Sequence, residues 1–187
     1  MNYCEILKSD IANGTGIRVS LFVSGCTHRC KGCFNAMTWP FEAGHPFTRE
    51  VEDSILAALA PDWVTGLTLL GGEPMEPANQ PTLVAFCRRV REILPAKTIW
   101  CYTGCVYEKD LLAQEAARRL AFPPPQDTYW RTPVTDEFLS MIDVLVDGPF
   151  VESLKDISLK FRGSSNQRIL VRQSDGTFAA TQDFIRL

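Results

Sequence analysis

The sequence predicts a single α/β domain over residues 1–187, built as an open, partial barrel of mainly parallel strands. Strand-like segments alternate with helix-like segments, an order that favours parallel strands joined by right-handed crossovers. Four such units and one appended strand are too few to close an eight-stranded barrel. The length of 187 residues suffices for one domain, and 45% hydrophobic with 22% charged residues is an ordinary globular composition.

The first strand is predicted over 17–23, where apolar residues recur at every second position: Ile17, Val19, Leu21 and Val23. A helix follows, because Thr48 can cap its start and Pro61 ends it. The second strand is predicted over 64–70, a short β-prone segment that stops at two glycines. This strand, helix, strand succession is one parallel unit.

The rest of the chain continues the alternation. The predicted elements are a helix over 80–94, a strand over 97–102, a helix over about 107–120, a short helix over 136–141, and strands over 143–146 and 169–172. Residues 121–133 contain several prolines and predict a stiff loop. Asp175 and Gly176 predict a hairpin turn after the last of these strands. We expect Cys87 to be a core residue of its helix.

Charge and hydropathy exclude several classes of protein. The net charge of -3 gives no general attraction to phosphate backbones or anionic membranes, so neither nucleic acid nor membrane is an expected partner. The N-terminal residues lack the features of a secretory signal, and no run of some 18 apolar residues occurs. We therefore expect a cytoplasmic protein, where thiols stay reduced.

Three cysteines follow the first strand at the spacing C-x3-C-x2-C: Cys26, Cys30 and Cys33. Thiolates are the usual ligands of iron–sulfur clusters, and three of them would leave one iron of a four-iron cluster free to bind a small molecule. A zinc site stays open as an alternative, its fourth ligand recruited from His28, Cys4, Cys101 or Cys105. Disulfides are disfavoured because the cysteine count of seven is odd.

Polar residues and glycines occur at the ends of three other predicted strands. The sequence Gly-Gly-Glu-Pro over 71–74 lets backbone approach a ligand closely, and Glu73 could receive an ammonium group. Thr103 and Asp147 follow two later strands. The carboxyl ends of parallel strands meet at one edge, which predicts a site there; a plain tight turn and a solvated aspartate are the alternatives.

The cysteine loop and the Gly-Gly-Glu-Pro turn together resemble the radical S-adenosylmethionine enzymes. Within them, the chain is similar to the glycyl radical enzyme activases that serve the anaerobic ribonucleoside-triphosphate reductase. The likeness covers nearly the whole chain and rests on residues 13–18 (NGTGIR), 21–26 (LFVSGC), 33–35 (CFN), 102–104 (YTG), 143–148 (DVLVDG) and 162–167 (RGSSNQ). The Pro-rich residues 122–133 depart from the short connection expected in that family.

The resemblance implies a [4Fe-4S] cluster on Cys26, Cys30 and Cys33, with the amino and carboxylate groups of S-adenosylmethionine on the fourth iron. An electron from a flavodoxin-type donor would split the cofactor into methionine and a 5'-deoxyadenosyl radical. That radical would take a hydrogen atom from a glycine of the reductase large subunit. A glycine radical is stabilised by the two flanking peptides, and the cofactor supplies the reactive chemistry while the protein positions it.

The resemblance also implies cofactor contacts. Gly71, Gly72 and Glu73 would hold the methionine part, and Thr103 and Asp147 the remaining polar groups. Many relatives carry an aromatic or aliphatic residue against adenine just before the third cysteine, where this chain has Gly32. The adenine contact is therefore expected from Phe34, with Asn35 beside it, or from backbone.

Three rival functions stay open from the sequence. The chain could activate another glycyl radical enzyme, of the pyruvate formate-lyase type. It could act on a small molecule, as the similar 7-carboxy-7-deazaguanine synthases do. It could be a zinc-binding interaction module without activity. A half-open barrel favours an activase, because an activase must admit and release a segment of another protein.

Overall fold

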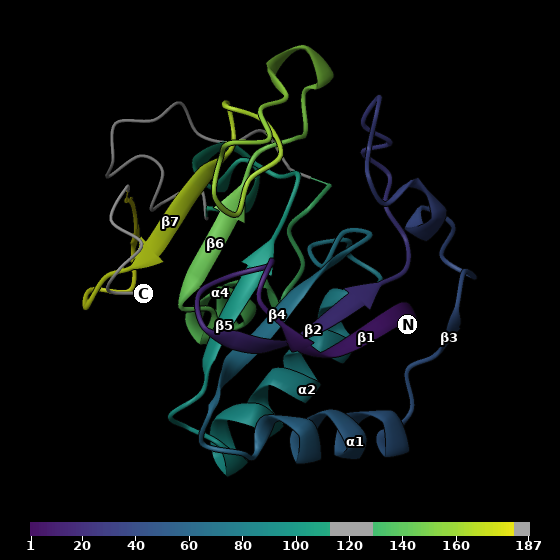
Figure 1. Cartoon of the computed structure of the whole chain (residues 1–187), viewed down its shortest axis with the longest axis vertical. Helices are drawn as coiled ribbons and strands as arrows, with labels where there is room; N and C mark the ends of the chain where they lie inside the picture. The colour runs from purple at the N-terminus through teal and green to yellow at the C-terminus, as the bar shows by residue number, and fades with distance from the viewer. Residues whose placement is uncertain (113–128, 182–187) are drawn as a thin grey trace.

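A computed structural model describes residues 1–112 and 129–181, whose strands form one eight-stranded sheet (Figure 1). The order of strands across the sheet is β3-β1-β2-β4-β5-β6-β7-β8. The strands are β1 (Asn2–Asp10), β2 (Ile17–Val23), β3 (His45–Pro46), β4 (Val64–Gly71), β5 (Thr98–Tyr102), β6 (Val144–Asp147), β7 (Arg168–Arg172) and β8 (Phe178–Ala180).

The centre of the sheet is parallel and its two sides are antiparallel. Strands β2, β4, β5 and β6 pair in parallel. At one side β1 pairs antiparallel with β2 and β3, and at the other β7 pairs antiparallel with β6 and β8. Figure 1 shows β7 running against β6. The sheet is thus open and mixed, and the expectation of mainly parallel strands holds only for the central four.

In the described part of the chain, three α-helices cover one face of this sheet. They are α1 (Arg49–Leu59), α2 (Gln80–Ile93) and α4 (Thr135–Met141). Thr48 precedes α1 as predicted, and Glu50 and Glu52 lie in its first turn, where the helix dipole favours negative charge. Figure 1 shows α1 and α2 beside each other below the strands.

The main core lies between the helices and the sheet. Alternate strand residues face the helices, because side chains of a strand point to opposite faces in turn. This set comprises Val19, Leu21, Val23, Leu67, Leu69, Ile99, Cys101 and Leu145. Cys87 of α2 belongs to the same cluster and is fully buried, which confirms its prediction as a core residue.

The opposite face of the sheet carries a smaller cluster and a buried cation. Trp100 packs there with Val144, Val146 and Ile169. The Arg18 guanidinium donates to Thr68 Oγ1 at 2.7 Å, to the Leu67 carbonyl at 2.7 Å and to the Thr98 carbonyl at 3.0 Å. Burial lowers the pKa of Arg18 to about 10. These contacts tie β2, β4 and β5 together from the side away from the helices.

Several element predictions are confirmed and others change. The bounds of β2 match the predicted strand, and α1, β4, α2, β5, α4, β6 and the β7-β8 hairpin all occur where expected. Strand β1 was not predicted. The predicted helix over 107–120 is a π-helical turn, Tyr107–Leu111, in its described part. The rest of it and most of the Pro-rich segment fall outside the described residues. Among the described residues, no helix is long and apolar enough to span a membrane.

Candidate functional site

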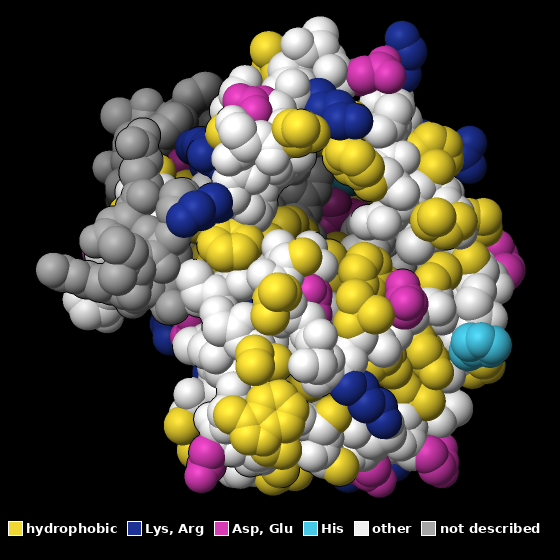
Figure 2. Space-filling view, in the orientation of Figure 1, with side chains coloured by type: hydrophobic (Ala, Val, Ile, Leu, Met, Phe, Trp, Pro, Cys, Tyr) yellow, Lys and Arg dark blue, Asp and Glu magenta, His cyan; other side chains and the backbone are white. Residues whose placement is uncertain are grey.

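A cavity of about 520 Å³ opens at the carboxyl ends of the parallel strands. Figure 2 shows a hollow on this face of the molecule, with hydrophobic side chains around it. The cavity is lined from the loops after four strands: by Cys26 and Cys33 after β2, by Gly72 and Glu73 after β4, by Thr103 after β5 and by Gly148 after β6. A cavity therefore lies at the edge of the sheet where the sequence predicts a site.

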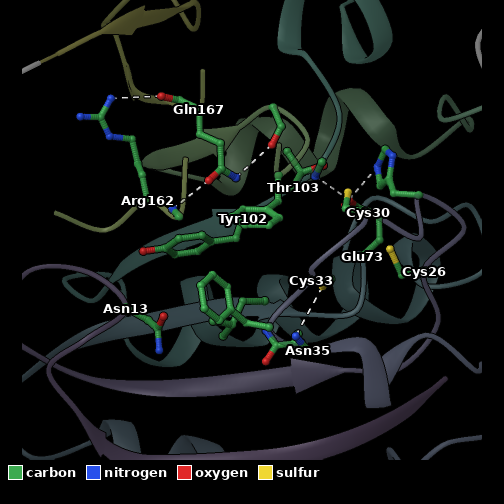
Figure 3. Close-up of a pocket in the computed structure, with 18 of the residues that line it drawn as sticks. Asn13, Cys26, Cys30, Cys33, Asn35, Glu73, Tyr102, Thr103, Arg162 and Gln167 are labelled. Atoms are coloured by element: carbon green, nitrogen blue, oxygen red, sulfur yellow. Dashed lines mark hydrogen bonds and ion pairs between the residues drawn. The ribbon is translucent and has the colours of Figure 1, made fainter. Parts of the chain in front are cut away.

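The cysteine loop brings all three thiols to the cavity wall (Figure 3). Gly25 starts the loop at a φ of +92°, and an added Cβ there would meet the Phe41 ring at 2.3 Å, so only glycine fits this turn. The Cys33 N–H donates to the Cys30 carbonyl at 3.1 Å. The Asn35 N–H donates to Cys33 Sγ at 3.4 Å. Hydrogen bonds to cluster sulfurs are one means of tuning a cluster potential.

Burial sets the protonation of these thiols. It raises the pKa of Cys26 to about 12, and the charge of Glu73 acts in the same direction. Burial also raises the pKa of Cys30. Both thiols therefore hold their protons at neutral pH until a metal replaces them, because only the thiolate is a ligand.

The geometry disfavours the zinc alternative. A zinc tetrahedron with Zn–S bonds of about 2.3 Å holds its sulfurs about 3.8 Å apart. Among the described residues, the group that brings three ligand atoms within 4.8 Å of one another is His28, Glu73 and Cys105, not the three loop thiols. Cys4 Sγ lies 3.2 Å from Ser24 Oγ, outside the cavity lining. The wider spread of the thiols suits a cluster, in which each cysteine binds a different iron.

Glu73 joins three segments of the site. It is 1% exposed, and its Oε1 accepts the Met75 N–H at 2.8 Å. Its Oε2 accepts the Gly104 N–H at 2.7 Å and lies 3.1 Å from His28 Nε2. Burial alone would lower the pKa of His28, but the contact with Glu73 outweighs it and raises that pKa. The carboxylate is thus engaged by the protein itself, and its contact with an ammonium group stays a prediction.

Two further contacts of the cysteine loop were not predicted from the sequence. Glu76 is fully buried, and its Oε1 accepts the Thr27 N–H at 2.6 Å and the Thr27 hydroxyl at 2.7 Å. Tyr129 donates to the other oxygen at 2.9 Å. The His28 ring stacks on Trp130 with centroids 4.2 Å apart. The only sequence signal was a second carboxylate three residues after Glu73.

Gly71 and Gly72 lie against the start of the cysteine loop. A Cβ on Gly71, whose φ is +105°, would meet Phe22 backbone at 2.7 Å, and a Cβ on Gly72 would meet the Gly25 carbonyl at 2.5 Å. The Gly72 N–H donates to the Val23 carbonyl at 2.8 Å. The glycine pair therefore lets the loops after β2 and β4 approach each other. It also leaves backbone without side chains beside the thiols, where a ligand could contact the glycines and the thiols together.

The remaining predicted residues divide into two groups. Thr103, Phe34 and Asn35 line the cavity, and the Phe34 ring contacts the Phe150 ring with centroids 5.4 Å apart. Asp147 does not line the cavity. Its carboxylate accepts the Tyr107 N–H at 2.9 Å and pairs with Arg168, whose Nε lies 2.9 Å from Oδ1. In the structure Asp147 joins β6 to β7, and its contact with the cofactor stays a prediction.

The chain has relatives of known family along most of its length. Residues 12–170 match the family described as 4Fe-4S single cluster domain. The anaerobic ribonucleoside-triphosphate reductase-activating proteins of Escherichia coli K12 and Salmonella typhi are each 41% identical over 169 residues, which cover 89% of this chain and 96% of theirs. That of phage T4 is 34% identical over 169 residues, 90% of this chain and 93% of its own. The chain therefore belongs to the family of anaerobic ribonucleoside-triphosphate reductase-activating proteins.

Proposed function

We propose that this protein generates the glycyl radical of an anaerobic ribonucleoside-triphosphate reductase, using a [4Fe-4S] cluster and S-adenosylmethionine. The observation that carries the proposal is one arrangement: three thiols and a bare glycine pair face a single cavity at the carboxyl ends of parallel strands. Its family supplies the partner and the cofactors. The spread of the thiols, too wide for a zinc tetrahedron, favours a cluster over a zinc-binding module.

Cys26, Cys30 and Cys33 would hold three irons of the cluster, and the backbone of Gly71 and Gly72 would lie beside the methionine part of the cofactor. When bound, the cluster and S-adenosylmethionine supply the one-electron reduction and the hydrogen-atom abstraction. Every other contribution comes from the chain. Glu73 and Glu76 tie the cysteine loop to the segments that follow β4 and β5.

The order of the strands supports a finer proposal about the fold. Parallel strands β2, β4, β5 and β6 follow one another in sequence order, with the described helices α1, α2 and α4 on one face. This progression is that of a (β/α) barrel, whereas a doubly wound sheet reverses direction and has helices on both faces. We propose that the sheet is an open part of a radical S-adenosylmethionine barrel.

The electron donor is proposed to be a small redox protein of the flavodoxin type. Arg29 and Lys31 lie exposed on the cysteine loop itself. A loop at the surface lets a donor come close to the cluster, and basic side chains there attract an acidic partner.

The test is anaerobic reconstitution with iron and sulfide, reduction, and addition of S-adenosylmethionine with and without the reductase. We expect 5'-deoxyadenosine and a glycine-centred electron spin signal on the reductase. Cys30→Ala should abolish both. A colourless wild-type protein that yields neither product would end the proposal, and a spin signal on a pyruvate formate-lyase-type enzyme alone would redirect it. Turnover of a small molecule without any partner protein would favour a synthase.

A further inference from the structure

Three side chains next to the cysteine loop bring different kinds of metal ligand together: His28, Glu73 and Cys105. Their ligand atoms are an imidazole nitrogen, a carboxylate oxygen and a sulfur, and all three lie within 4.8 Å of one another. The residues come from the cysteine loop, the turn after β4 and the loop after β5. None of them is one of the three loop thiols assigned to the cluster. This triad therefore offers a second, separate place for a metal ion.

The distances within the triad are close to those of a zinc site. With zinc–ligand bonds of about 2.0–2.3 Å, tetrahedral geometry places neighbouring nitrogen, oxygen and sulfur ligands about 3.3–3.6 Å apart. His28 Nε2 lies 3.1 Å from Glu73 Oε2 and 3.7 Å from Cys105 Sγ, so the two distances bracket this range. Small side-chain shifts are enough to admit the ion.

Hydrogen bonding alone does not serve all three atoms of the triad. His28 Nε2 carries at most one proton, yet it is within contact distance of both the Glu73 carboxylate and the Cys105 sulfur. Sulfur is a weak hydrogen-bond partner, whereas the thiolate is a strong zinc ligand. A cation in place of that single proton contacts the nitrogen, the oxygen and the sulfur together.

Outer contacts already hold the ligands in place. The Gly104 N–H donates to Glu73 Oε2 at 2.7 Å and precedes Cys105 directly in the chain. The His28 ring stacks on Trp130, with centroids 4.2 Å apart and planes inclined by 16°. Such outer partners orient metal ligands before the ion arrives. His28 and Glu73 line the cavity, and the His28 side chain is 15% exposed, which gives an ion a path to the buried sulfur.

We propose that His28, Glu73 and Cys105 bind one zinc ion, which clamps the cysteine loop to the segments after β4 and β5. This inference does not depend on the proposed function, because the cluster ligands are other residues. A set of imidazole, carboxylate and thiolate suits zinc, whereas magnesium and calcium take oxygen ligands. Binding displaces the Cys105 thiol proton and any proton at His28 Nε2, and both pass to solvent. Water takes the fourth position of the tetrahedron.

The experiment counts zinc in the reconstituted holoenzyme, where the cluster occupies the loop thiols. Wild type, Cys105→Ser and the matched control Cys101→Ser are dialysed anaerobically with equimolar Zn²⁺ and then against buffer. Cys101 is also fully buried, but it belongs to β5 and not to the triad. Wild type and Cys101→Ser should each keep one zinc ion per chain with their iron content unchanged. Cys105→Ser should bind zinc at least about tenfold more weakly, because outer partners of metal ligands alone contribute that much.

Two further measurements use the same proteins. Zinc should raise the melting temperature of wild type and Cys101→Ser but not that of Cys105→Ser, because only a bound ion stabilises the folded state. Co²⁺ in place of Zn²⁺ should add a thiolate-to-cobalt absorption band to the difference spectrum, and Cys105→Ser should lack it.

His28→Gln tests the same site if Cys105→Ser does not fold, since glutamine can still hydrogen-bond to Glu73 but loses the imidazole ligand. No zinc kept by wild type, or equal zinc in wild type and the triad variants, would overturn the inference. Failure of the iron–sulfur cluster to assemble would instead refute the proposed function. The difference between Cys105→Ser and Cys101→Ser would still report zinc at the triad, which keeps the two failures distinct.

Discussion

Replacing Glu73 by glutamine separates two roles for this carboxylate. If Glu73 received the ammonium group of S-adenosylmethionine, the variant would lose cofactor affinity and keep its stability. In the structure its oxygens already accept the Met75 and Gly104 N–H groups and contact His28. Glutamine has one acceptor oxygen, so one buried N–H loses its partner and the charge-assisted contact with His28 disappears. We therefore expect a loss of stability even without the cofactor.

The size of this loss follows from the two broken contacts. An unsatisfied buried N–H costs about 1–3 kcal/mol, and a hydrogen bond to a charged group contributes about 1.5–3 kcal/mol. Together they predict a decrease of about 3 kcal/mol in the free energy of unfolding. For a chain of this length that is a fall of roughly 6–12 °C in melting temperature.

The assay is thermal and urea unfolding of the reconstituted protein with and without S-adenosylmethionine. Glu152→Gln is the matched control, because Glu152 pairs with Lys31 of the same cysteine loop but its side chain is 49% exposed. That change should stay within about 0.5 kcal/mol of wild type. If Glu73→Gln unfolds like wild type without the cofactor and differs only in its presence, the bracing role assigned to Glu73 is wrong.

Three further outcomes are expected. Cys33→Ala should lose the visible absorbance of the cluster after reconstitution, whereas Cys87→Ala, in the core between α2 and the sheet, should keep it and lose only stability. Arg18→Met should lower the free energy of unfolding by about 2–4 kcal/mol in urea, because buried carbonyls of Leu67 and Thr98 lose their donor. Asp147→Asn should weaken the junction of β6 and β7 by about 2 kcal/mol without altering cofactor affinity by isothermal calorimetry, and a selective loss of affinity would restore Asp147 as a cofactor contact.

Local pattern was enough to predict the central strands and helices. In β2 the apolar residues Val19, Leu21 and Val23 face the helices, so their alternation in sequence reflects a real difference between two faces. Thr48 occupies the N-cap position of α1, although its side chain makes no capping hydrogen bond, and Pro61 follows the end of the helix. Such elements can be recognised without their tertiary partners.

Strand direction could not be predicted in the same way. β1 has mixed exposure along its length and two register shifts against β2, so it shows no clean alternation. β7 pairs antiparallel with β6, and the sequence of β7 carries no sign of which way its neighbour runs. The expectation of mainly parallel strands followed from the alternation of helices and strands in the central units. It fails where no α-helix connects neighbouring strands, as between β1 and β2 and between β6 and β7.

In the site, too, features set by local sequence were predictable and features set by tertiary contacts were not. The thiols and the glycine pair were found because their spacing is chemically distinctive. The partners of Glu73 and Asp147 were not, because the Gly104 N–H and the Arg168 side chain reach them only through the sheet register. A hydroxyl without a partner among the described residues, such as that of Tyr102, has no sequence signature, because only the fold shows which neighbouring residues could form a hydrogen bond with it.

One oxygen of Glu73 contacts both His28 beside the thiols and Gly104 beyond β5. Anything that moves one of these groups disturbs the other, and such coupling acts equally in both directions. A shift of the cysteine loop is therefore passed to the backbone that follows β5 through this one carboxylate.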